Sequence, residues 1–137
     1  MKAFILILIV FPSVAFSQVS VKASYQRPNH NWGISAGHYS QTNDWSSYGV
    51  ELMFHEGEYD LLSIAFIPKL EQWGFNLHAG PKFGIIFDND ANDFSALVGA
   101  GYTIIERIEL GYRYNVGISK VDGEHLNFGV AYLGINL

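Results

Sequence analysis

The amino-acid sequence predicts an all-β protein: an eight-stranded antiparallel up-and-down β-barrel that spans a membrane and is preceded by a cleaved signal peptide. Three observations lead to this prediction. The N-terminus has the features of an export signal, and most of the remaining chain alternates with a period of two residues. The apolar side of that alternation is also too bulky for the inside of a narrow barrel.

The N-terminal residues predict a secretory signal peptide over residues 1–17. Lys2 supplies the positive charge, and an apolar run follows from Ala3 to Phe11. Ala15 and Ser17 are the small residues expected just before a cleavage site. The apolar run is too short for a spanning helix, which needs about 20 residues. We therefore expect export through the general secretory pathway, cleavage after Ser17, and a mature barrel domain over residues 18–137.

Composition excludes several classes of protein. The chain has no Cys, so disulfides, thiolate metal sites and thiol catalysis are excluded. The formal net charge is −5, which disfavours nucleic acid as a partner. Hydrophobic residues make up 49% of the chain, yet no apolar run after the signal peptide is long enough for a spanning helix. A chain of this kind that spans a membrane has to form a closed barrel. We expect no cofactor.

Eight runs of residues have the character of β-strands. The alternation is clearest from Trp73 to Ile118, where one side is bulky and apolar and the other is small, polar or charged. The fourth and eighth runs are apolar on both sides, so their facing stays open, and 68–72 is expected to be a connection. The predicted strands are Val19–Arg27, Trp32–Ser40, Ser47–His55, Tyr59–Ile67, Trp73–Phe87, Phe94–Ile104, Ile108–Ile118 and His125–Leu137.

The turns between the fifth, sixth and seventh strands predict a meander. A six-residue turn over 88–93 places Phe87 opposite Phe94, and a shorter turn places Ile104 opposite Ile108. Neighbouring antiparallel strands must agree on which face is apolar, and these three agree.

The volume of the apolar side chains decides which face lies inside. A barrel of eight strands has an interior only just wide enough for side chains. The fifth and seventh strands alone carry twelve bulky residues on one side, and the opposite side is rich in Gly. The apolar side is therefore predicted to face lipid. The alternative is a secreted lipocalin-like barrel that binds a ligand. The twelve residues are Trp73, Phe75, Leu77, Phe83, Ile85, Phe87, Ile108, Leu110, Tyr112, Tyr114, Val116 and Ile118.

Aromatic residues and turns predict how the barrel sits in the membrane. Aromatic residues near strand ends fit interfacial girdles, namely Trp32, Trp45, Trp73, Tyr25, Tyr48, Tyr59, Tyr102 and Tyr132. With both termini toward the periplasm, the outer loops are short and offer no obvious surface for a receptor. These loops are Arg27–Asn31, His55–Glu58, Asp88–Asp93 and Ser119–Glu124.

The pattern carries a family resemblance. A signal peptide, eight short alternating strands, and the segments Val-Gly-Ala-Gly-Tyr-Thr (98–103) and Glu-Leu-Gly-Tyr-Arg-Tyr (109–114) resemble small outer-membrane β-barrel proteins of the OmpA-like class. The resemblance implies an integral protein of the outer membrane of a Gram-negative-type bacterium with a structural or envelope-associated role and no open pore. It also implies outer-membrane lipid and lipopolysaccharide, periplasmic chaperones and the barrel-assembly machinery as partners.

Charged residues on the polar side of the strands predict a network inside the barrel. A buried charge without a partner is expensive, so these residues should pair with one another. The pairs could form a salt-bridged plug or a path for ions or protons, and the narrow interior favours the plug. The residues are Lys22, Glu51, His78, Lys82, Glu109 and Arg113.

One short motif raises the possibility of an enzyme. His38-Tyr39-Ser40, followed by Glu51, resembles the His-x-Ser and Glu site of outer-membrane lipid A 3-O-deacylases, in which His activates Ser and a carboxylate orients the His. The alternation, however, places His38 and Ser40 on the lipid side and Glu51 on the interior side. We therefore assign no catalytic residue.

The acidic stretch Asp88–Asp93 carries oxygen ligands of the kind that Ca²⁺ prefers. It lacks the Gly at position six and the Glu at position twelve of an EF-hand loop, where Asp93 and Gly99 stand instead. We expect a solvated turn and no metal site.

Overall fold

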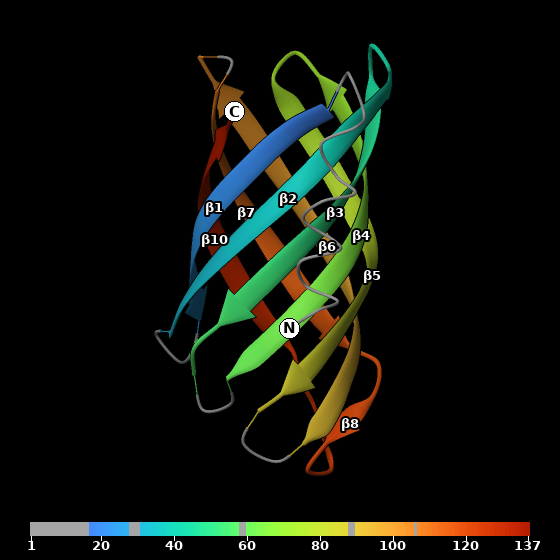
Figure 1. The fold of residues 1–137 in the computed structure, drawn as a ribbon, viewed down its shortest axis with the longest axis vertical. Helices are drawn as coiled ribbons and strands as arrows, with labels where there is room; N and C mark the ends of the chain where they lie inside the picture. Colours follow the sequence, from blue (N-terminus) through green and yellow to red (C-terminus); the bar gives the residue numbers. More distant parts are fainter. Residues whose placement is uncertain (1–16, 28–30, 58–59, 88–89, 106) are drawn as a thin grey trace, which may run out of the picture.

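The computed structural model describes residues 17–27, 31–57, 60–87, 90–105 and 107–137, and they form the predicted eight-stranded closed barrel (Figure 1). Residues 1–16 of the predicted signal peptide lie outside the described residues. Among the described residues, no helix is long and apolar enough to cross a membrane. The barrel strands are β1 (Ser17–Arg27), β2 (Asn31–Asn43), β3 (Ser46–His55), β4 (Leu61–Gln72), β5 (Phe75–Ile86), β6 (Ala91–Ile104), β7 (Ile108–Gly117) and β10 (Phe128–Asn136).

Each strand pairs antiparallel with its neighbours in the sequence, and the first strand pairs with the last. The β1–β10 ladder runs from Ser20↔Asn136 to Arg27↔Gly129 and closes the cylinder. Closure leaves no edge strand with unpaired backbone groups. A barrel of this kind can therefore lie in hydrocarbon, where no water is present to satisfy those groups.

The predicted alternation is confirmed, with apolar side chains outside and polar ones inside. On β5, for example, Leu77 is 63% exposed on the outer face, whereas its neighbour His78 is 3% exposed inside the barrel. The two undecided strands follow the same rule. β4 turns Ile64, Phe66 and Leu70 outward, and β10 turns Leu133 and Ile135 outward. β10 also places Phe128, Val130 and Tyr132 inside the barrel.

Several strand boundaries differ from the predicted ones. Trp73 and Gly74 form a tight turn with φ values of 52° and 82°, so β5 begins only at Phe75. β4 runs through Pro68 to Gln72, a segment predicted to be a connection. The β4–β5 pairing is interrupted between Ala65↔Lys82 and Lys69↔His78. Pro68 lies within this interruption, where its missing N–H removes no ladder hydrogen bond.

The turn predicted over 88–93 is shorter, because 91–93 already belong to β6. As a consequence Phe94 pairs with Phe83, and not with Phe87 as predicted, whereas Ile104 does pair with Ile108.

The connection predicted as the loop Ser119–Glu124 contains a small hairpin, made of β8 (Lys120–Val121) and β9 (Glu124–His125). It lies at the end of the barrel opposite the C-terminus, at the bottom of Figure 1. Val121 is 3% exposed and belongs to a buried apolar cluster with Leu61, Ile86, Phe128 and Val130. The hairpin therefore folds against the barrel end and helps to close it.

Most of the predicted girdle residues point outward near a strand end. Trp32, Trp45, Trp73, Tyr48 and Tyr102 are exposed, and Tyr25 is half-buried against the Trp32 ring. The placement predicted for Tyr132 is wrong, because this residue is 4% exposed inside the barrel. Tyr59 lies outside the described residues.

Candidate functional site

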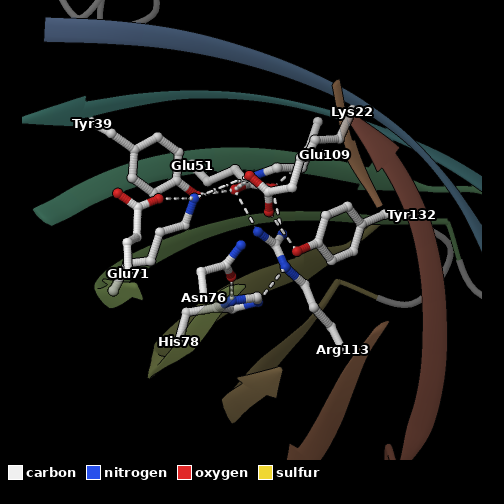
Figure 2. A network of polar contacts seen from close by, with 11 residues as sticks. Lys22, Tyr39, Glu51, Glu71, Asn76, His78, Glu109, Arg113 and Tyr132 are labelled. Atoms are coloured by element: carbon white, nitrogen blue, oxygen red, sulfur yellow. Dashed lines mark hydrogen bonds and ion pairs between the residues drawn. The ribbon is translucent and has the colours of Figure 1, made fainter. Parts of the chain in front are cut away.

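The centre of the barrel interior is the carboxylate of Glu51, which β3 places inside with no exposed surface. Its Oε2 accepts hydrogen bonds from Lys22 Nζ at 2.8 Å and from the Tyr39 hydroxyl at 2.5 Å. Its Oε1 accepts a hydrogen bond from the Ser35 hydroxyl at 2.6 Å. Figure 2 shows Lys22 and Tyr39, which come from the neighbouring strands β1 and β2, beside the Glu51 carboxylate.

Arg113 on β7 reaches the same carboxylate from across the barrel. Its Nη1 and Nη2 donate to the two Glu51 oxygens at 2.5 and 3.0 Å, which is the bidentate geometry that suits a guanidinium. Its Nε donates to Nε2 of His78 at 2.9 Å. Nε2 of His78 is then an acceptor, so the ring proton lies on Nδ1 and is donated to Oδ1 of Asn76 at 2.9 Å.

A second buried carboxylate, Glu109 on β7, extends the network. It accepts from Lys69 Nζ at 3.1 Å and from the Tyr132 hydroxyl at 2.6 Å. Lys69 also contacts Glu71 at 3.3 Å, and Glu71 lies near the end of β4 with a side chain that is 40% exposed. The chain of contacts therefore runs from the barrel centre to the end that carries the C-terminus.

Two tyrosine rings separate and contact the cations. Lys22 Nζ and Lys69 Nζ lie 4.9 and 4.8 Å from the centroid of the Tyr39 ring, and the Arg113 guanidinium carbon lies 4.6 Å from the centroid of the Tyr132 ring. These are favourable cation–π distances.

A smaller polar group lies toward the hairpin end of the barrel. Lys82 Nζ on β5 is 3.8 Å from Oδ2 of Asp93, and both side chains are fully buried. The Ser95 hydroxyl is 3.1 Å both from Oδ2 of Asp93 and from Oδ1 of Asn115. Lys82 Nζ also lies 5.0 Å from the centroid of the Phe128 ring.

Side chains fill the interior between these two groups. The cavity that Lys82 and Arg113 line has a volume of about 20 Å³, which is enough for one water-sized molecule. Apolar residues occupy the remaining cross-section in a cluster of Tyr39, Met53, Ala65, Ile67 and Leu97.

All six residues predicted for the interior network lie inside the barrel and are buried. The structure joins Lys22, Glu51, Arg113 and His78 through direct contacts, and Glu109 anchors the adjoining group. Lys82 lies apart from them, with Asp93 as its ion-pair partner.

Sequence reasoning missed several members of the interior groups, among them Ser35, Tyr39, Lys69, Asn76, Asp93, Ser95, Asn115 and Tyr132. The parity of Tyr39 and Asn76 within their strands would have placed both inside. Lys69 and Asp93 were predicted to lie in connections, but they belong to β4 and β6. Tyr132 lies on a strand that is apolar on both sides, so its sequence contained no usable signal.

The hydrolase-like residues do not form a site. β2 places His38 and Ser40 on the outer face, both half-buried, whereas Glu51 lies on the inner face. The barrel wall therefore separates the carboxylate from the His and Ser that it would have to orient.

No metal centre is found either. Among the described residues, no three His, Asp or Glu side chains are grouped so as to hold a metal ion. In the stretch predicted as a solvated acidic turn, residues 88 and 89 lie outside the described residues. Asp93 is not solvated, because β6 turns it inward toward Lys82.

Comparison with known proteins shows which solved structures have a similar fold. No protein-family model and no curated protein matches the sequence. Among solved structures, the outer-membrane protein Ail of Yersinia pestis is similar at a TM-score of 0.64 and 9% identity, over 88% of this chain and 99% of that one. The neisserial surface protein NspA is similar at a TM-score of 0.56 and 15% identity, over 88% and 94% of the two chains. The N-terminal barrel domain of Pseudomonas aeruginosa OprF has a TM-score of 0.56 and 16% identity, over 88% and 97%. The chain therefore has the fold of the small, OmpA-like eight-stranded barrels of outer membranes.

Proposed function

We propose that this protein is an integral outer-membrane barrel with a structural or envelope-associated role and no open pore. One observation carries the proposal: an apolar outer surface surrounds an interior that buried ion pairs and aromatic rings fill. Soluble monomers rarely expose an apolar patch of more than a few hundred Å². Here every barrel strand turns apolar side chains outward, so lipid is the environment that the outer surface fits.

The dimensions of the strands support the same proposal. The barrel strands contain between 9 and 14 residues, and a tilted spanning strand needs about 9–11. Lipid and lipopolysaccharide would contact the outer face, and both chain ends would face the periplasm. Export through the general secretory pathway, periplasmic chaperones and the barrel-assembly machinery would deliver the chain to this membrane, as the predicted signal peptide and the fold imply.

The experiment that tests the proposal begins with expression of the full-length chain in a Gram-negative host. The outer-membrane fraction is washed with carbonate and run on a gel with and without boiling. Retention after the wash, with a faster band in the unboiled sample, is the expected result. A soluble protein whose gel mobility is the same with and without boiling would refute the proposal and would favour a secreted barrel.

A planar bilayer then tests the filled interior. The purified barrel should insert without producing steps of ionic conductance, because ion pairs and aromatic rings lie in its interior. Steady open-channel currents from the folded protein would contradict the absence of a pore.

No feature of the structure favours the two alternatives from the sequence. Lipid A deacylation would need His38 and Glu51 on one side of the wall, and they lie on opposite sides. A lipocalin-like barrel would need an apolar chamber inside, and this interior is polar and filled. Mass analysis of lipid A from the expressing host would test the first alternative, and we expect its acylation to be unchanged.

A further inference from the structure

The small cavity between the two polar groups has an unusual lining. Among the described residues no carboxylate lines it, and its polar side chains are Ser24, Ser35, His55, Lys82, Arg113, Asn115 and Tyr132. Two cations therefore face a space of about 20 Å³. A site that holds one water needs roughly 10–15 Å³ by this kind of measure. The cavity is thus large enough for one small ion and too small for a molecule of several atoms.

The balance of buried charge points the same way. Among the described residues, four buried cations (Lys22, Lys69, Lys82 and Arg113) accompany three buried carboxylates (Glu51, Asp93 and Glu109). Lys22 and Arg113 share the single carboxylate of Glu51. Glu71 contributes a further negative charge, but it contacts Lys69 at the far end of the barrel, where its side chain reaches solvent. Of the two cations that share the Glu51 carboxylate, Arg113 lines the cavity.

Lys82 is also held loosely by its partner. Lys82 Nζ lies 3.8 Å from Asp93 Oδ2, which is close enough for an ion pair but too long for a hydrogen bond. An ammonium carries three N–H donors, and burial makes it expensive to leave them without acceptors.

His55 supplies an independent sign of a missing acceptor. The imidazole is 7% exposed and lines the cavity, and its Nε2 lies 3.4 Å from the Ser24 hydroxyl. Nδ1 is buried and has no hydrogen-bond partner in the protein. In the tautomer in which the Ser24 hydroxyl donates to Nε2, the ring proton lies on Nδ1. Nδ1 is then a buried donor that needs an acceptor from outside the chain.

We propose that this cavity binds one small monovalent anion, of the size and charge of chloride, between Lys82, Arg113 and His55. The anion would accept hydrogen bonds from these groups and would offset the positive charge of the two cations that line the cavity. The lining side chains lie inside the barrel, so the ion would be bound as the barrel folds around it.

The test compares the anions present during folding. The mature chain is folded into detergent in sodium chloride, sodium bromide or sodium gluconate at equal ionic strength. Gluconate is too large for the cavity. We expect the temperature at which the barrel unfolds to be roughly 5 °C higher in chloride or bromide than in gluconate, for a halide at about ten times its dissociation constant. Equal unfolding temperatures in all three salts would overturn the proposal.

Two variants with the same change of charge separate this site from a general effect of salt. Lys82→Gln removes a cation of the cavity and should abolish the difference between halide and gluconate. Lys120→Gln removes a cation from the exposed hairpin strand β8 and should retain the difference in full. A halide effect that survives Lys82→Gln would refute the site.

Crystals of the wild-type barrel grown in bromide give an answer that does not depend on whether Lys82→Gln folds. An anomalous peak in the cavity beside Lys82 and His55 is expected. Density for a water without anomalous signal would show that the cavity is hydrated and holds no anion, and the proposal would fail.

Discussion

The side chain of Glu51 connects four strands of the barrel. It accepts hydrogen bonds from Lys22, Ser35, Tyr39 and Arg113, which belong to strands on different sides of the cylinder. An ion pair in such a place has a large cost of desolvation, so the intact pair adds little net stability. Loss of one partner is different, because it leaves the other charge buried and uncompensated.

We predict that Glu51→Gln destabilises the folded barrel by about 3–5 kcal/mol, because Lys22 and Arg113 then share no negative charge. Urea unfolding in detergent micelles, followed by Trp fluorescence, measures the change. Glu124→Gln on the exposed strand β9 is the matched control and should alter stability by less than about 0.5 kcal/mol. Equal stability of the two variants would show that the interior network does not hold the barrel together.

Removal of both charges tests whether the large cost comes from a buried charge that has lost its partner. Glu51→Leu combined with Arg113→Met should cost less than the sum of the two single changes, because neither charge is then left without the other. Simple additivity in the double-mutant cycle would mean that the two residues act independently, despite their bidentate contact.

Strand alternation could be predicted from the sequence wherever one face was apolar and the other polar. This holds for β5, β6 and β7, and it placed Lys82, Glu109 and Arg113 correctly inside. It could not be predicted for β4 and β10, because both faces are apolar when a strand also contributes to an apolar cluster inside. The register across the turn between β5 and β6 could not be predicted either. Phe94 pairs with Phe83 because β6 begins at Ala91, three residues before the start of its hydrophobic pattern at Phe94.

The pairing of the charged residues inside the barrel could not be predicted from the sequence either. Arg113 meets Glu51 from the far side of the cylinder, 62 residues away in the sequence. Parity within a strand fixes which way a side chain points, but only the closure of the barrel and its register decide which inward side chains meet. Charge complementarity alone allowed several pairings among the six predicted residues.

The interrupted ladder between β4 and β5 leads to a prediction for two glycines on the inner face of β5. A Cβ at Gly80 would lie 1.8 Å from the backbone oxygen of Phe66, whereas at Gly84 the nearest atom is the flexible Cδ1 of Leu61 at 2.6 Å. Gly80→Ala should therefore cost about 2 kcal/mol or more in unfolding free energy, and Gly84→Ala about 1 kcal/mol or less. A larger cost for Gly84→Ala would show that the strands can separate at the interruption.

The β8–β9 hairpin should depend on one buried side chain. Val121→Ala removes two carbons from the cluster with Phe128 and Val130, which costs roughly 1.6 kcal/mol. We expect limited proteolysis in detergent to cut the hairpin faster in this variant. Val116→Ala on the lipid face of β7 is the control, and its hairpin should be cut at the wild-type rate. Equal rates in the two variants would mean that Val121 does not anchor the hairpin.

The whole molecule combines two surfaces that would each be unstable in the other's environment. The inner surface buries charges that pair only when the cylinder is closed, and the outer surface exposes apolar side chains that water would not favour. The same alternation of residues produces both surfaces. The barrel therefore depends on lipid or detergent outside for the same reason that it needs ion pairs inside.

The position of the barrel in the membrane gives the last prediction. Val98 lies in the middle of β6 and Ile104 at its end, and both point outward. If hydrocarbon surrounds the barrel, Val98→Lys should cost about 2–4 kcal/mol in folding stability and Ile104→Lys about 0–1 kcal/mol. Reversible urea unfolding in lipid vesicles measures both, and the same pair in a short-chain detergent should differ less, because a micelle adapts to a charge more easily than a bilayer does. Similar costs at the two depths in vesicles would contradict a spanning barrel, since the price of a charge in a bilayer depends on its distance from the surface.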